Sequence, residues 1–270
     1  MPLVSKSIFT TGPESGRRCI YEHPLNERIR LFLRLEWLFL HNRDLSQVAG
    51  AGACHARIGH LLDLGTLLQR GDIRKEILRE FERVQLTWNQ LRTLPHLDPE
   101  RLDHLLAEFS EKTRALLDPK ERLGEGLKNC ELLNLVKSKS VLPGGATDFD
   151  VPAYGRFIQI DPAARQAALD AWYGELAPIE TAVLFYLKLL RESATFTERT
   201  SPTGGFEEDL TPLAAMSLIR IALEPGCDCF PEVSANRHRL FIRFLAQPNP
   251  CERPIAVKTT VRWQIQHCQL

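Results

Sequence analysis

The sequence predicts an α+β protein, with an α-helical domain and an antiparallel β domain. Over the first two-thirds of the chain, apolar residues recur at intervals of three and four, which is typical of half-buried helices. Towards the carboxy terminus they alternate with polar residues instead, as in strands that bury one face. A run of apolar residues among turn residues at 148–160 predicts an additional mid-chain β segment.

The helices are expected in order along the chain, each from its own pattern. The segment 25–41 is apolar on nearly every side, which predicts a buried helix. Asp98-Pro99, Asp118-Pro119 and Asp161-Pro162 each combine a capping residue with a proline suited to the first helical position. Helices are expected over 25–41, 53–70, 73–92, from 98 to about 116, over 127–138, from 162 to about 176, and from 178 onward.

The expected strands lie at both ends of the chain. Cys19, Ile20 and Tyr21 form a short first strand, and four more are expected over 213–223, 230–233, 238–245 and 255–265. The segment 194–212 is polar and is expected to be a long loop. The α-helical domain then comprises 23–141 and 162–200, and a discontinuous β domain comprises 18–22, 142–161 and 201–270. Residues 1–17 are rich in Ser, Thr, Gly and Pro and are expected to form a flexible extension.

Composition excludes several classes of protein. The 270 residues contain 34 basic and 34 acidic side chains, so no global positive field marks a nucleic-acid binder. The longest apolar stretch, 31–40, is interrupted by Arg34 and Glu36 and is too short to cross a membrane. The amino-terminal residues lack the apolar core of a signal peptide. We therefore expect a cytoplasmic protein whose seven scattered cysteines stay reduced.

The last two predicted strands carry the clearest functional pattern. Arg237, Arg239, Phe241 and Arg243 share one face of the first strand, and Lys258, Thr260 and Arg262 share one face of the second. A short linker at 246–254 predicts that the two strands form a hairpin. Its basic faces would then merge into one outward patch, because residues 236–270 contain six basic residues and one acidic residue.

This patch suits an extended acidic partner. Arg239 and Arg243 would lie about 13 Å apart, with Phe241 exposed between two guanidinium groups that can grip carboxylates. Such binding requires that the arginines project outward together and are not each neutralised by an acidic neighbour in the same chain. The alternative is an ordinary charged strand face, which protects edge strands from aggregation.

Motifs for catalysis and cofactor binding are absent from the sequence. It contains no GxxxxGK[ST], GxGxxG, HExxH or GxSxG pattern. Cys227 and Cys229 form a CxC pair with no second pair at zinc-ribbon spacing, and His55 and His60 lie off a shared helix face. We expect no catalytic residues, no metal and no cofactor.

Several sequence blocks together resemble the ZapD family of bacterial Z-ring-associated cell-division proteins. They are YEHPLNERIRLFLRLEWLF (21–39), LLQRGDIRKEILREFERVQ (67–85), LVKSKSVLPGGATDFDVPAYGRF (135–157), LAPIETAV and LLRESATFTERTSPTGGF within 176–206, and HRLFIRF (238–244). The chain departs from the family in its amino-terminal extension, the Cys227/Cys229 loop and the segment after 246. A further basic position of the family falls on Glu131.

The resemblance implies a non-enzymatic homodimer with a helical and a β domain. It implies binding to the C-terminal tail of FtsZ, the tubulin-like division GTPase, and cross-linking of FtsZ filaments into bundles that promote Z-ring assembly and septation at midcell. The basic family positions for this binding match Arg70, Arg239 and Arg243. The apolar helix at 25–41 is a candidate dimer interface, with a buried core helix as the alternative.

Two other functions are compatible with the residues. A nucleic-acid-binding module could use the same basic face, although few aromatic residues are available for stacking. An enzyme could use the carboxylates of Asp148, Asp150, Glu207 and Glu208. We expect binding to FtsZ, no nucleic-acid partner and no membrane insertion.

Overall fold

The computed structural model describes residues 18–91, 98–118, 123–210, 216–236 and 238–270. Three expectations concern residues outside these ranges: the extension at 1–17, the basic side chain of Arg237, and the helix start at Asp118-Pro119 from Pro119 on. The chain divides into two compact units, one formed by 34–185 and the other by 1–33 with 186–270. The helices α1 (Glu27–Ser46) and α9 (Ala177–Glu192) contribute residues to both units. The predicted α+β fold class is confirmed.

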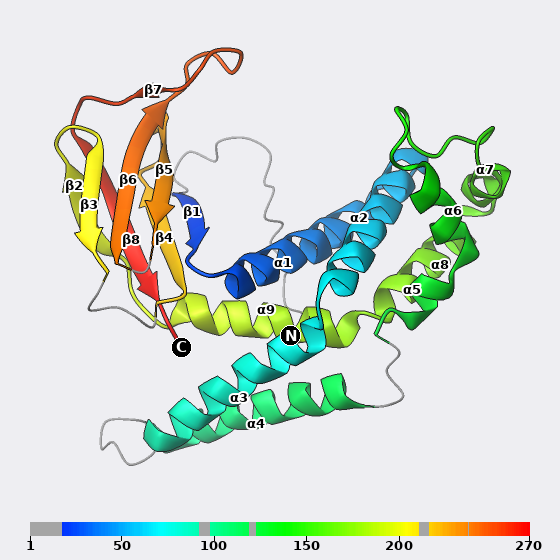
Figure 1. The fold of residues 1–270 in the computed structure, drawn as a ribbon, viewed down its shortest axis with the longest axis horizontal. Helices are drawn as coiled ribbons and strands as arrows, with labels where there is room; N and C mark the ends of the chain where they lie inside the picture. The colour runs from blue at the N-terminus through cyan, green and yellow to red at the C-terminus, as the bar shows by residue number, and fades with distance from the viewer. Residues whose placement is uncertain (1–17, 92–97, 119–122, 211–215, 237) are drawn as a thin grey trace. The chain divides into compact units, whose positions relative to one another are not determined.

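The unit 34–185 is helical among its described residues. Besides parts of α1 and α9 it contains α2 (Ala51–Arg70), α3 (Ile73–Leu91), α4 (Pro99–Leu117), α5 (Glu125–Asn129), α6 (Glu131–Lys139), α7 (Pro152–Gln159) and α8 (Pro162–Gly174). Figure 1 shows α3 and α4 running side by side. Their contact is aromatic, because the rings of Phe81 and Phe109 meet edge to face with centroids 4.8 Å apart.

Two predicted helix starts are confirmed by their capping bonds. The Asp98 carboxylate accepts hydrogen bonds from the backbone N–H groups of Glu100 and Arg101, and Asp161 caps α8 in the same way. Caps of this kind satisfy N–H groups that have no partner within the helix. The helix expected over 127–138 is divided between α5 and α6, because the backbone is extended at Cys130.

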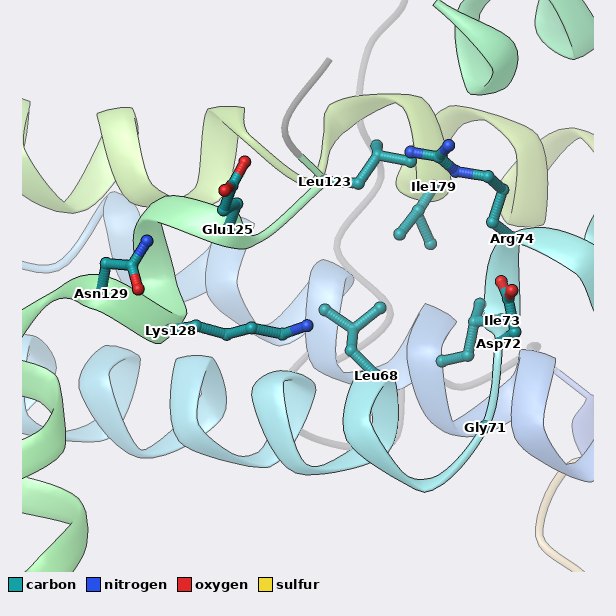
Figure 2. Close-up of a pocket in the computed structure, with 10 residues that line it drawn as sticks. All are labelled: Leu68, Gly71, Asp72, Ile73, Arg74, Leu123, Glu125, Lys128, Asn129 and Ile179. Carbon is teal, nitrogen blue, oxygen red and sulfur yellow. The ribbon is translucent and has the colours of Figure 1, made fainter. Parts of the chain in front are cut away.

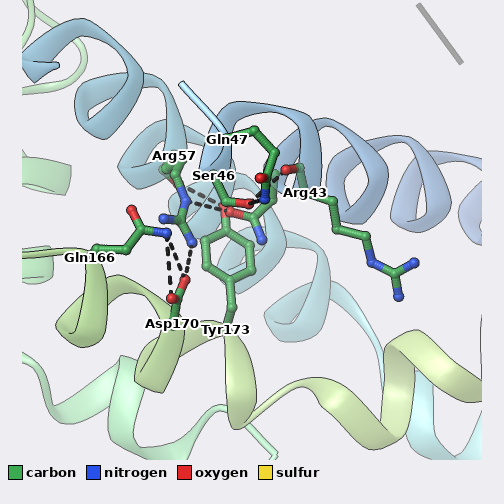
Figure 3. Close-up of polar contacts among 8 residues, drawn as sticks. Arg43, Ser46, Gln47, Arg57, Gln166, Asp170 and Tyr173 are labelled. Atoms are coloured by element: carbon green, nitrogen blue, oxygen red, sulfur yellow. Dashed lines mark hydrogen bonds and ion pairs between the residues drawn. The ribbon is translucent and has the colours of Figure 1, made fainter. Parts of the chain in front are cut away.

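A buried arginine ties three helices of this unit together. The Arg57 side chain on α2 is 2% exposed and donates hydrogen bonds of 2.7 Å to Asn42 on α1 and to Asp170 on α8 (Figure 3). The Tyr173 hydroxyl donates to the Arg57 carbonyl oxygen at 2.8 Å. Burial raises the pKa of Tyr173 well above its usual range, so this hydroxyl stays protonated and remains a donor.

The β unit is a two-layered sandwich. Its strands are β1 (Cys19–Pro24), β2 (Thr197–Ser201), β3 (Gly205–Asp209), β4 (Leu218–Leu223), β5 (Cys229–Ala235), β6 (Arg239–Ala246), β7 (Ile255–Ala256) and β8 (Val261–Cys268). One sheet has the order β1-β4-β8-β2, and the other has β3-β6-β5 with β7 beside β6 (Figure 1). Leu240, Ile242 and Phe244 of β6 share one buried core with Val261, Trp263 and Ile265 of β8.

The β segment expected at 148–160 is wrong. Residues 152–159 form the helix α7, because Val151, Tyr154 and Ile158 follow a helical rather than an alternating period. The segment 142–161 accordingly contains no strand and belongs to the helical unit.

The segment 194–212, expected to be a loop, forms the strands β2 and β3. Each pairs on one side only, and the outer face of such an edge strand can be polar. Ser201 at the end of β2 is buried, where its hydroxyl accepts a hydrogen bond of 3.0 Å from the Trp263 indole N–H.

The hairpin predicted between 238–245 and 255–265 is confirmed only at Ile255–Ala256, and the rest of the second strand is not a partner of the first. Strand β6 pairs with β3, β5 and the two-residue β7, whereas β8 pairs with β2 and β4 in the other sheet. Both strands turn their apolar faces to the shared core, so they oppose each other across the sandwich instead of lying in one sheet.

Candidate functional site

The outer face of β6 presents the predicted Arg–Phe–Arg series. Arg239, Phe241 and Arg243 are exposed, whereas Leu240, Ile242 and Phe244 between and after them are buried. Strand alternation produces this arrangement, since successive side chains point to opposite faces of the sheet. The outward projection of Arg239 and Arg243 on one face is therefore confirmed.

Each of these arginines has an acidic neighbour in its own chain, contrary to the expectation that neither would be neutralised in this way. Arg239 Nη1 lies 2.8 Å from Glu207 Oε1 on β3, and Arg243 Nη2 lies 2.5 Å from Glu232 Oε2 on β5. The four side chains are 53–63% exposed. Ion pairs this exposed are worth about 0–1 kcal/mol, so a competing carboxylate can replace them.

The register of the sheet explains these partners. Glu232 is directly opposite Arg243, and Asp209 is directly opposite Arg239, while Glu207 is opposite Phe241. Paired residues of antiparallel strands share a face. The described part of this face therefore carries three carboxylates beside two guanidinium groups and is not the strongly basic patch expected from the linear sequence.

A groove follows the outer face of β6 beside these pairs. It has a volume of about 820 Å³, and Glu207, Glu232, Val233, Ser234, Phe241 and Arg243 are among the residues that line it. Phe241 is 42% exposed, which leaves an apolar contact between the two arginines. The groove combines an apolar floor with charges of both signs, a suitable surface for an extended peptide with acidic side chains.

The remaining basic candidates of the β unit lie elsewhere. Arg262 is exposed on β8, on the outer face of the other sheet, because Val261 and Trp263 on either side of it are buried in the core. Lys258 is exposed in the connection between β7 and β8. The merging of Arg262 with Arg239 and Arg243 into one patch is thus wrong, because the two sheets turn these outer faces away from each other.

Arg70 belongs to the helical unit, where it is the last residue of α2. A groove of about 690 Å³ begins at the chain segment that follows it. Leu68, Leu123 and Ile179 form its apolar lining, with Arg74 and Lys128 at its side (Figure 2). Sequence patterns did not indicate this groove, since its residues come from α2, α3, α5 and α9 and from the segment before α5.

Carboxylates considered for an enzyme are engaged in structural contacts. Asp148 accepts a hydrogen bond from the Phe149 N–H at 3.0 Å, and Asp150 accepts one from the Thr147 hydroxyl at 2.9 Å. Glu208 lies 2.9 Å from a ring nitrogen of His267. In the described residues, no group of three or more His, Cys, Asp or Glu side chains is arranged to hold a metal ion.

The Cys227/Cys229 pair lies in the β unit, at the connection that leads into β5. The sulfur atoms are 3.0 Å apart and both cysteines are free thiols. Burial, together with the neighbouring Cys227, raises the pKa of Cys229 to about 12. A thiol with this pKa is a weak nucleophile at neutral pH, which agrees with a structural role.

No helix in the described parts of the chain has both the length and the apolar character needed to cross a bilayer. This finding covers 18–91, 98–118, 123–210, 216–236 and 238–270.

Comparison with known proteins identifies the family. A family model described as "ZapD: Cell division protein" matches residues 33–243. The chain is 32% identical to the cell division protein ZapD of Methylococcus capsulatus over 93% of this chain and 98% of the relative. It is 33% identical to the ZapD of Dechloromonas aromatica over 89% of this chain and 97% of that protein. The chain therefore belongs to the ZapD family of cell division proteins.

Proposed function

We propose that this chain binds the C-terminal tail of FtsZ and, as a homodimer, cross-links FtsZ filaments into bundles during Z-ring assembly at midcell. The observation that carries the proposal is the exposed Arg239–Phe241–Arg243 series on β6 in a member of the ZapD family. The proposal is non-enzymatic and needs no cofactor.

Binding at a single site is expected to be weak. The arginines are exposed and already paired, so a tail carboxylate exchanges one ion pair for another and gains little from charge alone. Apolar contact with Phe241 contributes the additional free energy of binding. Salt should change the affinity only modestly, since it screens the exposed pair that is lost and the exposed pair that is gained alike, over about 10 Å at 0.1 M ionic strength.

Bundling follows from multivalency. A dimer presents two sites and a filament presents many tails, so avidity can exceed the affinity of one site by about 10²–10⁴-fold. Dimerisation is thus required for cross-linking but not for tail binding. On α1, Ile29, Phe32, Leu35 and Phe39 are buried within the chain, whereas Trp37 is 49% exposed and could contact a second copy.

Arg70 is proposed as an additional contact, on the basis of its match to a basic family position. A tail segment that reaches the groove after α2 would find apolar side chains beside the basic Arg74 and Lys128 and the acidic Asp72 and Glu125. Charge reversal in Arg70→Glu is expected to weaken tail binding without changing the dimer.

Nucleic-acid binding is the less favoured function. Glu207, Asp209 and Glu232 share the outer face with Arg239 and Arg243. Three carboxylates at this face leave no excess of positive charge, on which binding of a phosphate backbone depends, whereas the proposed peptide needs only the two guanidinium groups.

Co-sedimentation with filaments tests the proposal. The protein should pellet with filaments of full-length FtsZ and bundle them, and should do neither with FtsZ that lacks its C-terminal tail. An excess of free tail peptide should dissolve the bundles, because each bound peptide removes one bridge. Equal bundling of tail-less filaments would refute the proposal.

A further inference from the structure

Two glutamates form ion pairs with the arginines of the β6 surface. Glu207 Oε1 lies 2.8 Å from Arg239 Nη1, and Glu232 Oε2 lies 2.5 Å from Arg243 Nη2 and 3.1 Å from its Nε. We propose that Glu207 and Glu232 are specificity-determining residues of this site. They compete with a ligand for Arg239 and Arg243, and so select a peptide that has one carboxylate on each side of an apolar residue. This inference rests on the proposed function of the same site.

The positions of the glutamates suit this role. They lie on the two strands that flank β6, so each reaches an arginine from the opposite side of the strand. Both also line the groove that contains Phe241. A peptide that follows β6 therefore passes between the two glutamates, beside the guanidinium groups with which they pair.

The pairs can open because they are exposed. The arginine side chains are 62–63% exposed and the glutamates 53–54%. A released glutamate regains its hydration, so the exchange of a protein carboxylate for a ligand carboxylate is nearly neutral in free energy. A ligand with one carboxylate consequently gains almost nothing by replacing one glutamate.

A ligand with two carboxylates behaves differently. Once its first carboxylate has replaced a glutamate, the second exchange is intramolecular and has a high effective concentration. Arg239 and Arg243 are four residues apart on one strand, or about 13 Å at about 3.3 Å per residue. An extended peptide spans this distance with acidic residues at positions one and five, which leaves the residue at position three beside Phe241.

Neutralising the glutamates should therefore strengthen binding. Glu207→Gln and Glu232→Gln keep the size of the side chain and remove its charge. Loss of one exposed competing pair should tighten peptide binding by about 1.5–5-fold, and loss of both by about 2–25-fold.

The test uses the full-length protein and labelled synthetic peptides in a fluorescence anisotropy titration. One peptide carries two aspartates four residues apart with a leucine midway, a second has one aspartate replaced by asparagine, and a third has both replaced. Glu198→Gln is the matched control, because Glu198 is exposed on β2 in the other sheet and its substitution changes net charge equally.

The inference predicts that the wild-type protein prefers the peptide with two aspartates, and that both site variants bind it more tightly while Glu198→Gln does not. Unchanged or weaker binding by the site variants would overturn the inference and leave FtsZ tail binding intact. Equal tightening by Glu198→Gln would overturn it as well, because the effect would then reflect net charge. Absence of any binding by the wild-type protein to an FtsZ tail would refute the proposed function itself.

Discussion

Phe241 provides a direct test of the apolar part of the proposed site. Its side chain projects from the outer face of β6 between the two arginines and is 42% exposed. An aromatic side chain offers about 200 Å² to a contact, so a ligand can cover at most about 85 Å² of what remains exposed. At about 25 cal/mol per Å², full coverage contributes about 2 kcal/mol.

The substitution Phe241→Ala should therefore weaken tail binding by about 5–30-fold, where the lower value corresponds to coverage of half the exposed area. The dissociation constant for a labelled FtsZ tail peptide would be measured by anisotropy at constant ionic strength. Circular dichroism would confirm that the variant is folded, as expected for a side chain on the outer face of the sheet.

Ile255→Ala is the matched control, because Ile255 is 62% exposed on β7 in the same unit. It should leave the dissociation constant unchanged. Wild-type affinity in Phe241→Ala, or an equal loss in Ile255→Ala, would refute the assignment of this apolar contact.

Three further predictions concern stability and ionic strength. Glu22→Gln should lower the free energy of unfolding at pH 7 by about 1.5–3 kcal/mol, because it removes the charge that pairs with Arg191 and Arg220 at 2.7–2.8 Å. Burial alone would raise the pKa of Glu22, but these two arginines outweigh the effect of burial and hold the pKa low. Because the pKa is lower in the folded state, this stabilisation is present above the unfolded pKa of about 4.3 and is lost as the pH falls through the folded value, so urea titrations of wild type and variant should converge in acid. Asp170→Ala should cost about 1.5–3 kcal/mol by the same assay, since it removes the carboxylate partner of the buried Arg57 guanidinium; no change would contradict the proposed anchoring role. Tail binding should change only modestly between 50 and 300 mM salt, because one exposed ion pair is exchanged for another, and a steep dependence on salt would contradict this exchange.

Local patterns predicted much of the helical unit. Asp98 and Asp161 begin helices as expected, because a capping residue followed by proline acts through neighbouring backbone groups alone. The alternation along β6 likewise predicted which side chains project outward. These features depend on periodicity within one segment, which the sequence shows directly.

Features that depend on partner strands could not be predicted in this way. Neither the pairing of β6 with β3 and β5 nor the placement of β8 in the other sheet follows from alternation, which gives the faces of a strand but not its neighbours. For this reason the sequence indicated a basic patch, whereas pairing brings Glu207 and Glu232 from distant segments to the arginines. The edge strands β2 and β3 were missed because polar residues on an edge strand resemble those of a loop.

The central claim is that the outer face of β6 holds the FtsZ tail, and charge reversal tests it most directly. The double variant Arg239→Glu/Arg243→Glu would be compared with Lys258→Glu/Arg262→Glu, which changes net charge equally at exposed positions outside that face. Binding of the tail peptide and bundling of filaments would be measured for both, with thermal unfolding as the check on folding. The account predicts loss of binding and bundling in the first variant and near wild-type behaviour in the second. Full bundling by a folded Arg239→Glu/Arg243→Glu protein would contradict it.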